Sequence, residues 1–286
     1  MTFNIETVGV VGAGQMGAGI AEVAAQAGLT VFLNDVAEER INGALATING
    51  HLSRQVSKGQ IDEAERRTIL DRIRVASTLD KLGECDLVIE AASENEEVKR
   101  KVFAALRSFL KPDAIVASNT SSISITRLAS VTANPERFIG IHFMNPVPRM
   151  QLVELIRGIA TKDETFEAAK AFVTRLGKTA TMSEDFPAFI VNRILLPMIN
   201  EAVYTLYEGV GSVEAIDTAM RLGANHPMGP LELADFIGLD TCLSVMQVLH
   251  EGLADSKYRP CPLLKQMTDA GLHGRKSGRG FYTYDA

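Results

Sequence analysis

The stretch TVGVVGAGQMGAGIAEVAAQAGLTVFLND, residues 7–35, carries the main signal for the fold. Its composition predicts a β-branched strand, a helix that stops at a glycine, and a second apolar strand, over residues 7–12, 16–28 and 30–35. Between the first strand and the helix the glycines follow the spacing G-x-G-x-x-G, at Gly12, Gly14 and Gly17. The stretch therefore predicts a strand–helix–strand unit that opens on a glycine turn.

The glycine spacing is typical of a loop that holds a dinucleotide pyrophosphate. Gly12 permits a tight turn, Gly14 lets backbone N–H groups approach the phosphates, and Gly17 allows close packing of helix on strand. The N-terminus of the helix then faces the anion. Asp35 ends the second strand, where a carboxylate can accept hydrogen bonds from the ribose hydroxyls. Since that carboxylate would repel a 2′-phosphate, the pattern favours NAD over NADP; ordinary turn geometry and a solvated strand end are the alternatives.

Apolar runs alternate with helical patterns through the first half of the chain. The runs cover residues 85–92, 114–119, 138–143 and 151–156, and helices are expected at 94–110 and 163–176. Continuous apolar strands separated by helices predict an α/β fold, a Rossmann-type doubly wound, mainly parallel sheet covered on both faces. One insertion, about 37–73, carries two helical patterns and predicts a helical hairpin.

The character of the sequence changes near residue 184. We expect an NAD-binding domain over 1–184 and an all-α C-terminal domain over 185–286, with helices at 188–208, 212–222 and 231–253. The apolar segment 239–249 either forms the core of the small domain or packs against a second copy of the chain. The second alternative predicts a homodimer through the C-terminal domain.

Composition excludes several classes of protein. The net charge of −6 argues against a nucleic-acid partner. No run of uncharged apolar residues is long enough to predict a membrane span. The three cysteines are far apart and lack zinc-ligand spacing, so they predict reduced thiols in a cytoplasmic protein without a metal site.

Polar residues follow three of the predicted strands. In an open α/β sheet the ligands bind at the carboxyl ends of the strands, so these residues should converge on one crevice. They are Glu94, Asn95 and Lys99 after the strand at 85–92, the run 118–122 after the next strand, and His142 and Asn145 at the end of 138–143. Taken alone, the 118–122 run would also suit a helix cap.

Glu154 is the expected partner of His142. A carboxylate flanked by Val153 and Leu155 is costly to bury without a partner, and an imidazole is a natural one. A histidine whose tautomer and basicity are fixed by a carboxylate is suited to general acid–base chemistry beside a hydride acceptor. The pair predicts an alcohol dehydrogenation or its reverse.

Asn192 interrupts an apolar run in FIVNRILLPMINEA, at the start of the C-terminal domain. Its amide could reach back to the crevice. The alternative is an asparagine on the surface of a helix.

Seven segments together resemble the short-chain L-3-hydroxyacyl-CoA dehydrogenases, and among these the bacterial 3-hydroxybutyryl-CoA dehydrogenases. The segments occur in the order of that family and span nearly the whole chain: GAGQMGAGIA, EAASENEEVK, SNTSSISIT, HFMNPVPRMQLVELI, FIVNRILLPMINEA, LGANHPMGPLELADFIGLD and GRKSGRGFY. The resemblance implies a cytoplasmic, NAD-dependent oxidoreductase of fatty acid metabolism. It would oxidise (S)-3-hydroxyacyl-CoA, in particular 3-hydroxybutyryl-CoA, to 3-ketoacyl-CoA and run the reverse reduction.

The resemblance also implies a role for individual residues. His142 would be the general acid and base, Glu154 its partner, and Ser121 and Asn192 would contact the substrate oxygen. Coenzyme A would be contacted at His51 and Lys58. The residues implied at the cofactor are Gly12, Gly14, Gln15, Met16, Gly17, Asp35, Glu94, Lys99, Asn145 and Lys276.

Two positions depart from the family pattern. Ala188 stands where the family usually has glycine, which strains the chain if the position needs a positive φ and fits if it needs only a small residue. His51 stands where a small polar residue is common.

Two other functions stay open at this point. The same scaffold could oxidise another hydroxy acid, such as a sugar acid or carnitine. It could also serve as a non-catalytic NAD-binding structural protein, which loss of the His142–Glu154 pair would have indicated.

Overall fold

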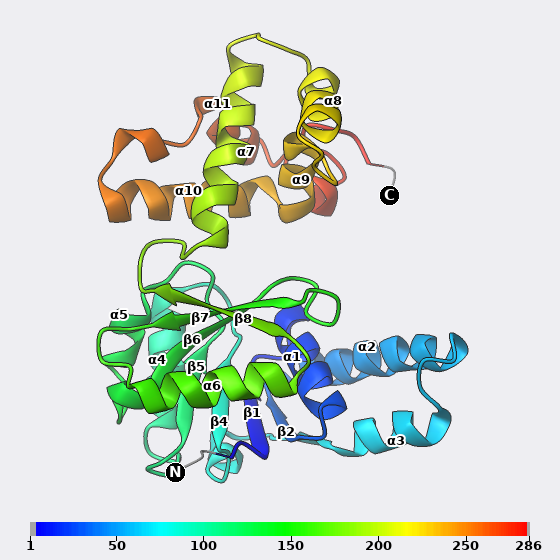
Figure 1. Cartoon of the computed structure of the whole chain (residues 1–286), viewed down its shortest axis with the longest axis vertical. Coiled ribbons are helices and arrows are strands. Elements are labelled where there is room, and N and C mark those ends of the chain that lie inside the picture. Colours follow the sequence, from blue (N-terminus) through cyan, green and yellow to red (C-terminus); the bar gives the residue numbers. More distant parts are fainter. Residues whose placement is uncertain (1–3, 285–286) are drawn as a thin grey trace. The chain divides into compact units, whose positions relative to one another are not determined.

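A computed structural model of the chain describes residues 4–284. The chain divides into two compact units, the first ending at Phe186 and the second beginning at Pro187. The first unit is built around one sheet, whereas helices make up nearly all of the second (Figure 1). The predicted fold class is thereby confirmed.

The sheet has eight strands in the order β3-β2-β1-β4-β5-β6-β7-β8. All neighbouring pairs are parallel except β6 and β7, which are antiparallel. The strand order changes direction at β1, so the crevice expected for a ligand lies beyond the carboxyl ends of β1 and β4. The strands are β1 (Thr7–Val11), β2 (Thr30–Asn34), β3 (Ile73–Val75), β4 (Leu87–Glu90), β5 (Ile115–Ser118), β6 (Phe138–Phe143), β7 (Leu152–Arg157) and β8 (Thr179–Glu184).

Helices cover both faces of this sheet. Buried residues of α1 and α6 share one core cluster with β6, in which Ile141 and Phe143 point toward these helices. The intervening residues of β6 face the opposite side, where Gly140 lies against Ile125 of α5. The helices of the first unit are α1 (Gln15–Gln26), α2 (Glu38–Ser57), α3 (Glu63–Asp71), α4 (Glu96–Leu106), α5 (Ile125–Ala129) and α6 (Asp163–Arg175).

The predicted hairpin is formed by α2 and α3, which extend beside α1 and away from the sheet (Figure 1). Ile48 and Leu52 of α2 are fully buried and join the core of the first unit. At the tip, Gly59 takes φ +66°, a conformation that favours glycine. The hairpin is thus anchored along α2 and turns at residues 58–62.

Two strands were missed in the sequence, β3 and β8. Both are edge strands, at opposite ends of the sheet. β8 has the pattern TATMSE and is mostly exposed, so it lacks the continuous apolar run that marks the buried strands. β3 has only three residues.

The second unit contains α7 (Val191–Tyr207), α8 (Val213–Gly223), α9 (Pro230–Ile237), α10 (Leu239–Leu253) and α11 (Pro262–Asp269). The single helix predicted at 231–253 is wrong: Gly238, at φ +102°, separates α9 from α10. Cys242, Val245, Met246 and Leu249 of α10 lie in the core of this unit. The segment 239–249 therefore serves as core.

Ala188 takes φ +62° and is fully buried. The position thus favours glycine for its backbone conformation, and alanine holds it at a cost in strain. Among the described residues, no helix combines the length and apolarity needed to cross a membrane.

Candidate active site

His142 and Glu154 are directly opposite each other in the antiparallel β6–β7 pair. Nδ1 of His142 lies 2.8 Å from Oε2 of Glu154, and the side chains are 8% and 0% exposed. Direct cross-strand neighbours have short Cβ distances, so the register itself holds the ring against the carboxylate. The pair expected from the sequence is present, near the carboxyl end of β6.

The glycine loop joins β1 to α1 as expected. A Cβ on Gly12, which has φ +106°, would lie 2.6 Å from the Ala91 carbonyl oxygen, and one on Gly17 would lie 1.7 Å from the Gly12 carbonyl oxygen. A Cβ on Gly14 would meet nothing within 4 Å. Gly12 and Gly17 are therefore required by the fold itself, whereas Gly14 leaves open space in front of the first turn of α1, as a bound pyrophosphate needs.

Asp35 closes this loop from the end of β2. Its carboxylate accepts hydrogen bonds from the N–H groups of Ala13, at 2.8 Å, and Ala37, at 3.1 Å. The side chain is half-buried and stands beside the glycine turn. The loop and Asp35 thus fit the adenosine half of NAD, the part of the cofactor that needs a phosphate cradle and a ribose acceptor.

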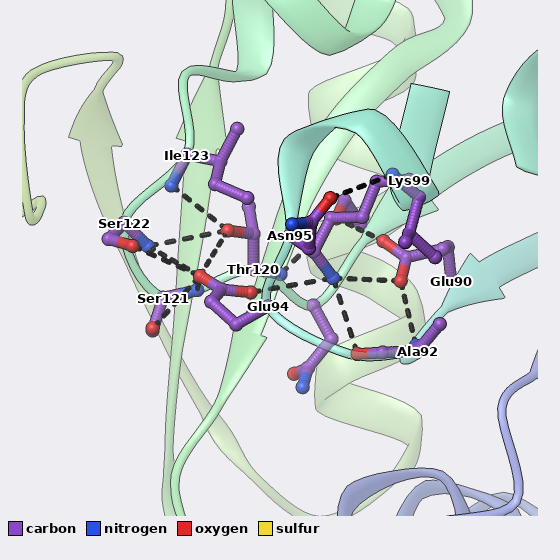
Figure 2. Close-up of polar contacts among 12 residues, drawn as sticks. Glu90, Ala92, Glu94, Asn95, Lys99, Thr120, Ser121, Ser122 and Ile123 are labelled. Carbon is purple, nitrogen blue, oxygen red and sulfur yellow. Dashed lines mark hydrogen bonds and ion pairs between the residues drawn. The ribbon is translucent and has the colours of Figure 1, made fainter. Parts of the chain in front are cut away.

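Glu94 organises the loop after β5. One of its oxygens, Oε1, accepts hydrogen bonds from the Thr120 hydroxyl, at 2.6 Å, and from both the N–H and hydroxyl groups of Ser121, at 2.9 and 3.1 Å. Its other oxygen lies 3.4 Å from Nζ of Lys99 (Figure 2). Burial alone would raise the pKa of Glu94, but the Lys99 charge and these hydrogen bonds hold it below the ordinary value. Ser121 is thereby placed by an ionised carboxylate.

Lys99 is itself 1% exposed, although the resemblance implies a contact with the cofactor. Its Nζ donates to Glu90 at 2.8 Å (Figure 2). Glu90 also accepts from the hydroxyl of Ser118 at 2.6 Å. Lys99 thus links a fully buried carboxylate to Glu94. Sequence reasoning missed Glu90, although it ends the apolar strand LVIE and the argument applied to Glu154 would have found it.

A cavity of about 790 Å³ in the first unit is lined by four more of the residues that the sequence analysis assigned to cofactor or substrate binding. They are Gln15, at the start of α1, His51 and Lys58 of the hairpin, and Asn145 of the loop after β6. Met16 is half-buried at the same turn of α1. The cavity therefore connects the glycine loop with the hairpin tip.

Asn192 and Lys276 belong to the second unit. Asn192 is the second residue of α7, and Nζ of Lys276 lies 2.6 Å from Oδ2 of Asp240 in α10. Among the described residues, no group of three or more histidine, cysteine or acidic side chains could hold a metal ion.

The fold, the glycine loop and Asp35 define a dinucleotide-binding protein of the Rossmann class. Two family models cover nearly the whole chain: the 3-hydroxyacyl-CoA dehydrogenase NAD binding domain matches residues 7–186, and the 3-hydroxyacyl-CoA dehydrogenase C-terminal domain matches residues 189–284.

Individual relatives agree with the family models. The chain is 71% identical to a 3-hydroxybutyryl-CoA dehydrogenase of Bradyrhizobium diazoefficiens over 99% of this chain and 97% of the relative. It is 54% identical to a probable 3-hydroxybutyryl-CoA dehydrogenase of Bacillus subtilis, over 99% and 98%. The crystal structure of (S)-3-hydroxybutyryl-CoA dehydrogenase from Ralstonia eutropha matches with a TM-score of 0.97 and 50% identity, covering 99% of this chain and all of that one.

The chain belongs to the 3-hydroxyacyl-CoA dehydrogenase family, a class of NAD-dependent oxidoreductases.

Proposed function

We propose that the chain oxidises (S)-3-hydroxybutyryl-CoA to acetoacetyl-CoA with NAD⁺ and catalyses the reverse reduction with NADH. The names of the relatives point to this substrate. The observation that carries the chemistry is the His142–Glu154 pair, in which an almost buried imidazole lies 2.8 Å from a fully buried carboxylate. Such a pair can move one proton at a fixed position, as the oxidation of an alcohol requires.

In this proposal His142 is the general base of the oxidation. Its Nε2 takes the proton of the 3-hydroxyl, and Glu154 stabilises the imidazolium that forms. Bound NAD⁺ supplies the hydride acceptor. In the reverse direction the imidazolium returns the proton to the oxygen of the 3-ketone, and Ser121 donates a hydrogen bond to that oxygen as charge develops on it.

The polar network behind Ser121 supports its part in this proposal. Glu94 binds both the N–H and the hydroxyl of Ser121, so the side chain is positioned before a substrate arrives. When the substrate binds, the Ser121 hydroxyl turns its single proton from Glu94 to the substrate oxygen, while the hydrogen bond from its N–H to Glu94 keeps the residue in place.

The cofactor contacts are proposed from the same geometry. The loop from Gly12 to Gly17, with Gln15 and Met16, would hold the pyrophosphate, and Asp35 the adenosine ribose. Glu94 and Asn145 would face the nicotinamide half. Lys99 acts in this proposal through Glu94.

We further propose that the second unit forms a homodimer. Large apolar side chains are exposed on it, among them Ile194 at 69%, Val210 at 74% and Leu222 at 82%. Exposed apolar groups of this size favour association between proteins. A cytoplasmic location is supported by three buried cysteines, Cys85, Cys242 and Cys261, none of which forms a disulfide.

The proposed activity is tested by following NADH absorbance with a panel of ketone substrates. Acetoacetyl-CoA should be reduced with NADH, while free acetoacetate and NADPH should support far lower kcat/KM. Reduction of a longer 3-ketoacyl-CoA would define the range of acyl chains. Equal rates on free acetoacetate or on a keto sugar acid would contradict the assignment to CoA esters.

A further inference from the structure

Lys178 is a buried lysine that the proposed chemistry does not use. It lies between α6 and the edge strand β8, and it is 9% exposed. Its Nζ donates hydrogen bonds to the backbone carbonyl oxygens of Val147 and Met150, both at 2.7 Å. Hydrogen bonds from an ammonium group are stronger than those between neutral groups. Lys178 therefore ties the segment 147–150 to the edge of the sheet.

The tethered segment belongs to the loop that joins β6 to β7, residues 144–151. The two flanking strands carry His142 and Glu154, and the loop itself carries Asn145. Lys178 comes from outside this strand pair. It thus fixes the loop against a third part of the first unit.

Two cavities adjoin this loop. Asn145 and Val147 line the cavity of about 790 Å³ described above. Pro148 and Lys178 line a second cavity, of about 320 Å³, together with residues at the end of α1. A loop that borders open space has fewer packing contacts to hold it, so its individual anchors determine its position.

The side chain of Val147 is a second anchor of the loop. It is 2% exposed and lies against Gly19 of α1, where an added Cβ would be 2.8 Å from the Val147 Cβ. The side chain of Val147 is thus held by α1, while its carbonyl group is held by Lys178. Together the two contacts set the distance of the loop from α1.

We propose that Lys178 is a positioning residue for the nicotinamide half of the cofactor. By holding the carbonyl groups of Val147 and Met150, it keeps Asn145 in place beside α1. This inference rests on the proposed function, in which Asn145 faces the nicotinamide. The adenosine half of the cofactor lies at the glycine turn and Asp35, which are held by contacts of their own. Its binding should not depend on Lys178.

The inference predicts that the loss of Lys178 weakens the binding of NADH but not of ADP-ribose, which lacks the nicotinamide. In Lys178→Met, the Kd of NADH measured by isothermal titration calorimetry should rise about tenfold, as for the loss of one hydrogen bond. The Kd of ADP-ribose should stay within about twofold of the parent. Because the cavity of about 320 Å³ can admit water to the freed carbonyl groups, the variant should stay folded.

Lys170→Met is the matched control, because Lys170 is an exposed lysine of α6, the helix that leads to Lys178. It should leave both Kd values unchanged. Gly19→Ala disturbs the same loop from the side of α1, since its Cβ would displace Val147. Alanine favours the helix, so this variant should fold and should also weaken NADH alone.

A double-mutant cycle shows whether Lys178 acts through Asn145. Asn145→Ala should by itself raise the Kd of NADH about tenfold. Adding Lys178→Met to it should change that Kd by no more than about twofold, because the contact that Lys178 positions is already gone. Effects that multiply to about a hundredfold would show that Lys178 acts elsewhere, and would contradict the inference.

The inference is overturned if Lys178→Met binds NADH as tightly as the parent, or if it weakens ADP-ribose to the same degree. If Lys178→Met does not fold, Gly19→Ala decides by the same two results. These measurements use no coenzyme A ester, so they are separate from the test of the proposed function. An enzyme that reduces acetoacetyl-CoA and whose Lys178→Met variant keeps the parental Kd for NADH would contradict this inference alone.

Discussion

At the scale of single residues, buried carboxylates determine how the site is organised. Glu154, Glu90 and Glu22 are all at most 1% exposed, and each contacts a basic side chain. Since burying a lone charge costs several kcal/mol, each acid fixes the position of its partner. His142, Lys99 and His51 are held in this way.

Lys99 offers a direct measure of this effect. Replacing it in Lys99→Met leaves Glu90, which is fully buried, without its cation, so we expect the free energy of unfolding to fall by about 3–5 kcal/mol. Urea denaturation measures the change. Lys101→Met is the control on the same helix, because Lys101 is 75% exposed in its pair with Glu97 and should cost less than about 1 kcal/mol. Equal losses in the two variants would show that the Glu90–Lys99 pair is not a buried charge pair.

Some of these residues can be found from the sequence and others cannot. Glu154 stands out because its neighbours are apolar, and Glu90 could have been found in the same way. The burial of Lys99 could not, since a lysine in the charged helix ENEEVKRKVFAAL looks like its exposed neighbours. The strain at Ala188 also needed the structure, because only the value of φ decides between its two interpretations.

At the scale of elements, the β1–α1 turn contains one glycine that the fold requires and another that leaves space for the cofactor. Gly17→Ala would place a Cβ 1.7 Å from a backbone oxygen, whereas at Gly14 the Cβ would meet nothing within 4 Å. We expect Gly17→Ala to lose more than about 3 kcal/mol of stability. Gly14→Ala should stay within about 1 kcal/mol of the parent and raise the Kd for NADH about tenfold or more.

Thermal unfolding and NADH fluorescence titration measure the two effects. The prediction on Gly14 would be wrong if its alanine variant bound NADH as tightly as the parent.

Helices and strands were predicted correctly where burial in the core produces a regular pattern of apolar residues in the sequence. The central strands contain continuous apolar runs, and the amphipathic pattern of residues 37–73 indicated two helices. The edge strands β3 and β8 carry no such pattern, because most of their residues are exposed to solvent. The break between α9 and α10 depends on a single residue, Gly238, within an otherwise helical run.

At the scale of the whole molecule, both units keep their thiols inside. Burial raises the pKa of Cys85 and of Cys242 to about 12, and it also raises that of Cys261. At pH 8 the native chain should therefore react very slowly with a thiol reagent such as DTNB, and all three cysteines should react in denaturant. Rapid labelling of the native protein would contradict this picture.

The raised pKa values of these cysteines also predict that the free energy of unfolding decreases at high pH. The folded chain keeps its thiol protons, whereas the unfolded chain loses them above a pH of about 8.5. Stability contributed by these groups is thus complete below that value, and it should fall as the pH rises toward 12. Urea denaturation at about pH 8 and about pH 10 would show the decrease, and an unchanged midpoint would contradict it.

The central claim is that His142, held by Glu154, transfers the proton in the reduction of acetoacetyl-CoA. The most direct measurement is kcat for that reaction in His142→Gln, with NADH binding measured on the same preparation. We predict a fall in kcat of about 10²–10⁴-fold with an unchanged Kd for NADH. A variant that kept kcat within tenfold of the parent would contradict the claim.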